Sequence, residues 1–203
     1  MKLIEKLKYK ALQRGLIETH SEIDLKMAYY LVRDMPYCRA SNREPKTLIS
    51  EWRGTCSGKH YLLKALFLEL GYHSRIIACT SVIHIGEDII PPELFKLWED
   101  SGGRFVDVHN YLILELPDGD MVVDATWPSG SQKFDLRVNE KFIPGQNQQI
   151  ACTPIQIWTI PEASNPQEFK QELLRKHFTP AELAFREAFI HAIGEWMARE
   201  KGE

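Results

Sequence analysis

The segment that most constrains the fold is residues 104–127, which read RFVDVHNYLILELPDGDMVVDATW. Two runs rich in β-branched and other apolar residues flank a Pro-Asp-Gly sequence. This pattern is typical of two antiparallel strands joined by a tight turn. The first strand contains His109, and the second ends at Asp124. The sequence therefore predicts a β-hairpin that carries a histidine and an aspartate.

A second strong pattern begins at Cys56, within the stretch WRGTCSGKHYLLKALFLELG that covers residues 52–71. Apolar residues recur at helical spacing after the cysteine, and Gly71 supplies a C-terminal stop. Cys56 is therefore expected at or near a helix N-terminus. Unpaired backbone N–H groups and the positive end of the helix dipole favour the thiolate there, which is the nucleophilic form of the side chain.

Helical patterns also occupy both ends of the chain. Apolar spacing predicts two helices in the N-terminal segment 1–35 and a helical segment over residues 166–201. A β-rich run over residues 75–85 predicts a strand after the cysteine-bearing helix, and residues 149–160 predict one or two short strands. The last helix carries an apolar stripe that is expected to pack on the body of the domain rather than bind a ligand or a second subunit. This stripe consists of Phe185, Ala188, Phe189, Ala192, Ile193 and Trp196.

Composition is that of an ordinary globular protein. With 203 residues, 44% hydrophobic and 26% charged, the chain is expected to form a single domain over residues 1–203 without support from a metal or a disulfide, and no cofactor is expected. The formal net charge of −3 gives no electrostatic argument for a nucleic-acid partner. No run approaches the ~20 apolar residues that span a bilayer. Lysines interrupt the apolar positions of the N-terminus, which argues against a signal peptide. We therefore expect neither a nucleic-acid nor a membrane partner.

The cysteines also bear on the location of the protein. They are Cys38, Cys56, Cys79 and Cys152, and no CxxC pair occurs among them. The spacing predicts neither a zinc ribbon nor a dense disulfide framework. Scattered thiols of this kind are typical of a reducing compartment, so a cytoplasmic location is expected.

Three side chains supply the parts of a nucleophilic site. A cysteine nucleophile needs a base within hydrogen-bond reach, and the base needs a third group that holds its tautomer and stabilises the imidazolium. Cys56, His109 and Asp124 are of these three types. They are therefore the candidate catalytic residues.

Whether His109 and Asp124 meet depends on how the two strands of the hairpin pair. One register places Glu115 opposite Asp120 across a four-residue loop. His109 is then a diagonal neighbour of Asp124 on the same face, at about 7–8 Å between backbones. A tighter two-residue turn at Asp118-Gly119 stretches the pair apart, and a shift of one residue sends the two side chains to opposite faces. The catalytic hypothesis predicts the longer loop or a compensating bulge.

Three motifs in this order resemble a known group of proteins. They are GTC before the helix, HNYLILEL around His109 and VVDATWP around Asp124. Together they resemble the transglutaminase-like core of the papain-like cysteine fold over residues 52–128. The resemblance implies an α+β fold in which the cysteine-bearing helix packs on an antiparallel sheet. It also implies Cys56 as nucleophile, His109 as general base and acid, Asp124 as the orienting acid, and an acyl-enzyme thioester.

The resemblance also sets the expected reaction, which is acyl transfer or hydrolysis at a carboxamide or peptide carbonyl. The expected substrate is a peptide, a protein or a small amide. GTCSGKH lacks the Cys-Trp of the animal crosslinking enzymes, and no accessory domain is visible that would position an acceptor protein. Hydrolysis or deamidation is therefore expected over crosslinking.

An oxyanion hole requires donors aimed at the developing alkoxide. The backbone N–H of Cys56 is the first candidate. The indole of Trp52 and the amide of Asn42 are candidates for the second donor. Each also has a structural interpretation, because a tryptophan often anchors a core and an asparagine often forms a turn.

The same residues also fit two alternatives to a catalytic site. Cys56, His109 and Asp124 can each be structural, and the protein is then a non-catalytic peptide-binding or assembly module on the same fold. A zinc site is the second alternative, because Cys56 and His60 share one helix face and would complete a tetrahedral set with His109 and Asp124. Lys59 either lowers the pKa of the thiol or is solvated.

One insertion precedes the hairpin. Residues 86–103 contain a short, proline-started helical pattern flanked by glycines. Because this insertion leads directly into the strand that carries His109, it is expected to border the cleft, with Trp98 near Cys56.

Overall fold

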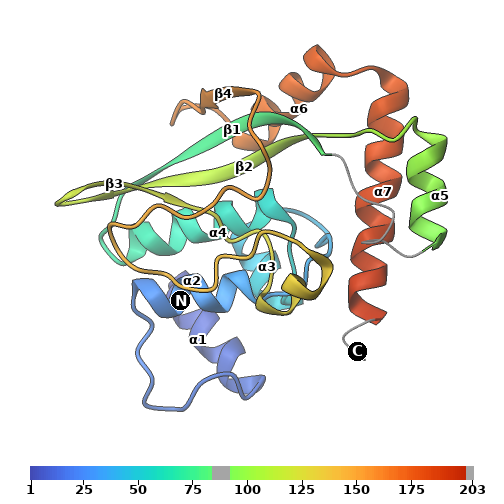
Figure 1. The fold of residues 1–203 in the computed structure, drawn as a ribbon. Coiled ribbons are helices and arrows are strands. Elements are labelled where there is room, and N and C mark those ends of the chain that lie inside the picture. The colour runs from blue at the N-terminus through green and yellow to red at the C-terminus, as the bar shows by residue number, and fades with distance from the viewer. Residues whose placement is uncertain (84–91, 200–203) are drawn as a thin grey trace.

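The computed structural model describes residues 1–83 and 92–199. Four helices come first, then the strands with one helix inserted among them, and two helices close the chain (Figure 1). The elements are α1 (Leu3–Gln13), α2 (Leu25–Arg33), α3 (Pro45–Glu51), α4 (Cys56–Glu69), β1 (Ser74–Ile83), α5 (Pro92–Asp100), β2 (Phe105–Leu116), β3 (Gly119–Val123), the 3-10 turn η1 (Ser129–Phe134), β4 (Gln156–Thr159), α6 (Pro166–His177) and α7 (Pro180–Arg199).

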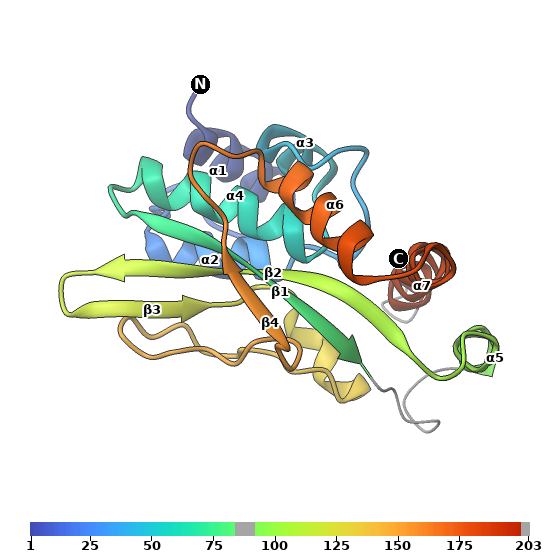
Figure 2. The ribbon, with the colours of Figure 1, turned by 90° about the horizontal axis from the view of Figure 1, so that it is seen from above.

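The strands form one antiparallel sheet in the order β3-β2-β1-β4, which Figure 2 shows from above. Helix α4 lies directly beneath this sheet, and α1, α2 and α3 lie beneath α4 (Figure 1). Helices α5 and α7 lie side by side beyond one end of the sheet. The prediction of an α+β fold, with helices on an antiparallel sheet and further helices at both chain ends, is confirmed.

The main core lies between α4 and the sheet. Most of the predicted apolar face of α4 is fully buried there, because Leu62, Leu63, Leu66 and Phe67 have no exposed surface, while Leu70, also predicted on this face, is half-buried. Leu173 and Leu174 of α6 join the same core, and α6 packs on β1 and β2. This packing fixes the N-terminus of α4 against the sheet.

A second apolar cluster lies between α7 and the end of β2. The stripe predicted on the last helix supplies much of it, since Phe189, Ile193 and Trp196 are buried. Ala188 was expected in the stripe but is exposed. Part of α7 thus covers the end of the sheet where β2 begins.

The hairpin adopts the register that brings His109 toward Asp124. Glu115 lies opposite Asp120, and the ladder extends one pair further, to Leu116 and Gly119. The turn itself is therefore Pro117-Asp118 and not the expected four-residue loop. Glu115 and Asp120 pair as expected for the four-residue loop, so the predicted register is confirmed. The predicted loop length is wrong, because the turn has two residues.

The insertion before the hairpin is described only in part. Residues 84–91 lie outside the described residues, and α5 makes up most of the remainder. Trp98 packs on Phe95, with ring centroids 5.4 Å apart, and joins the second apolar cluster. Within the part of α5 whose side chains are described, residues 94–100, none lines the cavity beside Cys56, so the expected position of Trp98 at the cleft is wrong.

Among the described helices, none has the length and apolar character needed to cross a membrane.

Candidate active site

The α3–α4 junction places Cys56 at the first position of α4. Thr55 is the N-cap, with extended backbone, and the first helical hydrogen bond runs from the Lys59 N–H to the Thr55 carbonyl at 3.0 Å. The N–H groups of Cys56 and Ser57 therefore lie in the first turn, where a helix offers unpaired donors. A Cβ atom at Gly58 would lie 2.9 Å from Leu48 Cδ2. Only glycine lets α3 pack this closely on the start of α4.

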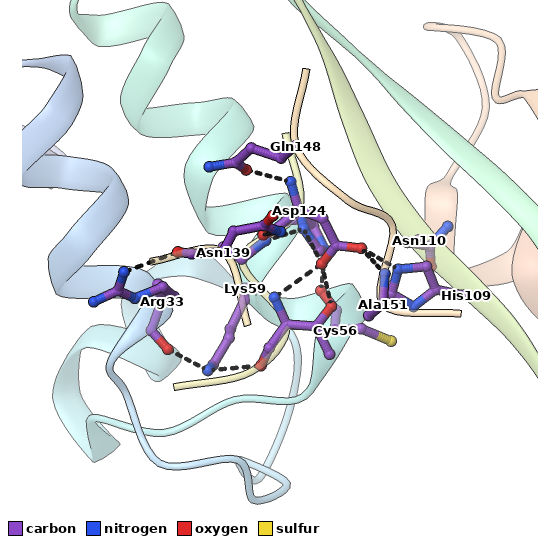
Figure 3. Close-up of polar contacts among 12 residues, drawn as sticks. Arg33, Cys56, Lys59, His109, Asn110, Asp124, Asn139, Gln148 and Ala151 are labelled. Carbon is purple, nitrogen blue, oxygen red and sulfur yellow. Dashed lines mark hydrogen bonds and ion pairs between the residues drawn. The ribbon is translucent and has the colours of Figure 1, made fainter. Parts of the chain in front are cut away.

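The structure brings His109 and Asp124 into direct contact, as Figure 3 shows. His109 Nε2 lies 2.8 Å from Asp124 Oδ2. The same carboxylate oxygen accepts the Ala151 N–H at 2.8 Å, while Oδ1 accepts the Thr126 hydroxyl at 2.6 Å and its N–H at 3.0 Å. Burial alone raises the pKa of Asp124, but the charge of His109 and these hydrogen bonds hold it below its usual range.

The backbone of Asp124 is fixed on both sides just beyond the end of β3. Its N–H donates to Gln148 Oε1 at 2.8 Å. Its carbonyl accepts the Asn139 amide at 2.9 Å and the Tyr29 hydroxyl at 3.2 Å. Residues from three parts of the chain thus hold the backbone of Asp124, and with it the carboxylate, in one position, and Figure 3 shows two of them, Asn139 and Gln148.

His109 connects the carboxylate to the thiol. Asp124 occupies Nε2 of His109, so Nδ1 is the ring nitrogen left for Cys56. Figure 3 shows the Cys56 sulfur on the side of the site where the His109 ring lies. Cys56 and His109 each shift the pKa of the other group. Burial opposes a charge on His109, but Asp124 and Cys56 together hold the pKa of His109 well above its ordinary value.

Cys56 itself is buried, with 3% of its surface exposed. Burial raises the pKa of a thiol, yet the charge of Lys170 and the interaction with His109 lower the pKa of Cys56 to about 6. A thiol with such a pKa is mostly thiolate at neutral pH. The site therefore favours a thiolate–imidazolium pair.

Lys170 is a site residue that the sequence did not indicate. Its ammonium lies 3.9 Å from Cys56 Sγ, 2.9 Å from Ser57 Oγ and 3.6 Å from Asp107 Oδ1. Asp107 also binds Arg186 of α7, whose Nε is 2.6 Å away. These three charged side chains are all buried. A weak signal existed only for Asp107, which lies two positions before His109 and so on the same face of β2.

The zinc alternative is not supported. His60 Nδ1 lies 2.7 Å from the Cys56 carbonyl, and Nε2 accepts the Ala125 N–H at 2.9 Å, so neither ring nitrogen is left for a metal. Burial lowers the pKa of His60 to about 4 and keeps it neutral. No group of three or more His, Cys, Asp or Glu suited to a metal occurs within residues 1–83 and 92–199. His60 instead ties the first turn of α4 to the residue after Asp124.

Lys59 is not the cation beside the thiol. It is fully buried, and its ammonium donates to the Arg33 carbonyl at 2.8 Å and to the Thr126 carbonyl at 3.1 Å. The expectation that it is solvated is wrong. Its contacts hold α4 to α2 and to the segment after β3.

The structure places neither proposed side-chain oxyanion donor at the site. Trp52 has a left-handed backbone with φ 54°, which turns its ring into the main core, where Arg14 lies 5.7 Å above it. Asn42 is exposed, and its carbonyl oxygen accepts the Glu44 N–H at 2.9 Å. Both predictions are corrected in favour of the structural interpretations, a core anchor and a turn former.

A cavity of about 100 Å³ adjoins Cys56, and His109 also lines it. Tyr37 and Trp127 line the same cavity, with their rings 4.3 Å apart. Burial and the nearby Cys56 raise the pKa of Tyr37 well above its ordinary value, so its phenol stays protonated and can donate. The indole N–H of Trp127 is buried and has no hydrogen-bond partner among the described residues. These two side chains are therefore the candidate oxyanion donors.

No protein-family model and no curated protein matches this chain.

Proposed function

We propose that the protein is a cysteine hydrolase or acyltransferase of the transglutaminase-like class, with a papain-like core, that acts on a carboxamide or peptide carbonyl. One observation carries the proposal. It is the buried group of Cys56, His109 and Asp124, in which His109 binds Asp124 and lines one cavity with Cys56, while the pKa of the thiol is lowered to about 6 and that of the imidazole is raised. This pairing supplies a nucleophile and a proton donor at the same pH.

The first half of the reaction forms a thioester. The Cys56 thiolate attacks the carbonyl carbon, and the negative charge moves to the carbonyl oxygen. Donors at the start of α4, together with Tyr37 and Trp127 in the cavity, are available to that oxygen. His109 gives its proton to the leaving nitrogen as the C–N bond breaks, and Asp124 keeps the ring oriented.

The second half returns the enzyme to its starting state. Water gives a proton to His109 and attacks the thioester carbon, and the C–S bond then breaks to release the acid and the thiolate. Water is the acceptor that needs the least room beside a cavity of about 100 Å³. Hydrolysis or deamidation is therefore proposed over crosslinking.

A non-catalytic peptide-binding module is the competing hypothesis. Such a module has no need for a lysine beside a buried thiol, and buried charges destabilise a fold unless they are paired. Lys170, Asp107 and Arg186 are nevertheless buried together beside Cys56. This arrangement favours a site in which the charge on sulfur matters.

Selective alkylation tests the proposal. At about pH 6.5, iodoacetamide should modify Cys56 faster than Cys38, Cys79 or Cys152, because the thiolate is the reactive form. His109→Ala should abolish that advantage, and peptide mapping identifies the modified residue. Equal, slow labelling of all four thiols would contradict a catalytic Cys56.

A further inference from the structure

The cavity beside Cys56 has almost entirely apolar walls. Phe105 of β2, Phe189 of α7 and Trp127 form one part of these walls, and Phe134, Trp196 and Ile193 form another. The rings interlock, since the centroids of Phe134 and Trp196 are 4.2 Å apart and those of Phe105 and Phe189 are 5.0 Å apart. Any group that reaches the Cys56 sulfur through this cavity is surrounded by hydrocarbon.

The charged residues that line the cavity are already paired with protein groups. Asp107 binds Arg186 through hydrogen bonds and lies 3.6 Å from the Lys170 ammonium. His109 is bound to Asp124. A charged substrate group would lose its hydration in the cavity without gaining a free counter-ion there. The cavity therefore excludes charged groups.

One polar feature of the wall matches a carbonyl. Trp127 has the buried indole N–H that lacks a hydrogen-bond partner among the described residues, and a buried donor without a partner costs stability. A carbonyl oxygen is the acceptor that the proposed reaction brings to this cavity. An apolar group joined to a carbonyl thus satisfies both the walls and the donor.

The volume limits the size of this group. An engineered apolar cavity of about 150 Å³ binds benzene. A cavity of about 100 Å³ is smaller than that, so it is suited to a short branched aliphatic acyl group of about four carbons and is too small for a benzoyl group.

We propose that the acyl side of the scissile bond is a compact, uncharged, apolar group that fills this cavity while its carbonyl carbon meets Cys56. This inference rests on the proposed function and adds the substrate class to it. The cavity walls from α7 and from the segment after β3 determine which acyl group is accepted. Cys56 of α4 and His109 of β2 perform the chemistry.

A series of p-nitrophenyl esters tests the inference on the full chain. In each case the Cys56 sulfur bonds to the acyl carbon, the C–O bond breaks and p-nitrophenolate leaves, so acylation is followed by its absorbance and by intact mass. The acyl groups are acetyl, isobutyryl, octanoyl and hemisuccinyl, and rates are divided by those of a small free thiol. The isobutyryl ester should acylate about tenfold faster than the acetyl ester, because two more carbons are buried. The octanoyl and hemisuccinyl esters should be slower than the isobutyryl ester.

Two substitutions at one wall position separate specificity from misfolding. Ile193→Phe should fill the cavity and slow isobutyryl transfer while acetyl transfer persists, and Ile193→Ala should shift the preference toward longer chains. Ile157→Ala is the matched control, because Ile157 is 57% exposed on β4 and should leave the preference unchanged.

The outcomes distinguish the two proposals. If Cys56 is acylated at equal normalised rates by all four esters, the apolar acyl pocket is wrong and the cysteine nucleophile stands. If no ester acylates Cys56 while denatured protein reacts, both proposals are overturned.

Discussion

The ammonium group of Lys170 lies 3.9 Å from the sulfur of Cys56, although 114 positions separate the two residues in the chain. Helix α6 is therefore part of the candidate site and not only a cover for the sheet. The lysine is held by Ser57 and Asp107, so its charge stays beside the sulfur. This contact gives the thiol a buried cation in addition to His109.

Replacing that cation should weaken the nucleophile. Lys170→Met keeps most of the side-chain volume and removes the charge, so the pKa of Cys56 should rise from about 6 toward the ordinary thiol value. Alkylation of Cys56 at about pH 6.5 should slow roughly tenfold or more. The pH profile of iodoacetamide labelling measures this shift. Lys176→Met, on the exposed side of α6, is the control and should leave the profile unchanged.

Asp124→Asn should impair catalysis more than it changes the fold. The asparagine can still accept from Thr126, but it removes the negative charge that stabilises the His109 imidazolium. Turnover should fall by about 10²–10⁴, as expected for an orienting carboxylate. The measurement is the rate of deacylation of an isobutyryl-enzyme formed on Cys56. An unchanged rate would remove Asp124 from the mechanism.

His60 predicts a specific dependence of stability on acid. Its pKa is lowered to about 4 in the folded protein, below the unfolded value of about 6.5. Its contribution to the free energy of unfolding is therefore complete above about pH 6.5 and is lost as the pH falls toward 4, on the order of 3 kcal/mol in total. Urea unfolding at several pH values measures it.

The matched variant for this measurement is His60→Gln. Glutamine can donate to the Cys56 carbonyl and accept from Ala125 but does not titrate, so the loss between pH 6.5 and about 4 should shrink. The difference between the two proteins cancels the other titrating groups, including His109, whose raised pKa acts with the opposite sign. An identical pH dependence in both proteins would show that His60 is not the buried neutral group described.

Gly58 should tolerate no side chain. In Gly58→Ala the added Cβ would meet Leu48 Cδ2 at 2.9 Å, so the buried Leu48 side chain or the helices around it must shift. We expect a loss of about 1–3 kcal/mol in the free energy of unfolding, measured by urea titration. Gly130→Ala is the control, because no atom lies within 4 Å of a Cβ there. Equal effects of the two changes would contradict the close packing.

The parts of the site that share local patterns were predictable. Alternating and β-branched residues predicted the hairpin, helical spacing placed Cys56 at the start of a helix, and one strand register brings His109 to Asp124. That register rests on pairing, which the Pro117-Asp118 turn restricts but does not determine. The sequence could therefore predict which strand register brings His109 to Asp124, but not that the hairpin adopts it.

The parts that depend on distant packing were not predictable. Lys170 belongs to an ordinary amphipathic helix, and nothing near it in the sequence indicates that its ammonium reaches Cys56. Trp52 and Asn42 each carry a side-chain N–H donor, which made them candidates for the oxyanion hole. Trp52 has a left-handed backbone and its ring lies in the main core, and neither feature follows from the local sequence pattern. Helix α3 (Pro45–Glu51) was missed because it is short and its surrounding sequence is polar.

The most direct test of a thiolate at Cys56 is its ultraviolet titration. The thiolate absorbance of the native protein is followed against pH, and that of the Cys56→Ser variant is subtracted. This removes the contribution of Cys152, whose pKa is also lowered, by its hydrogen bond with Cys79. We expect a difference curve for one thiol with a midpoint near pH 6. A midpoint near the ordinary thiol value, about 8.5, would contradict it.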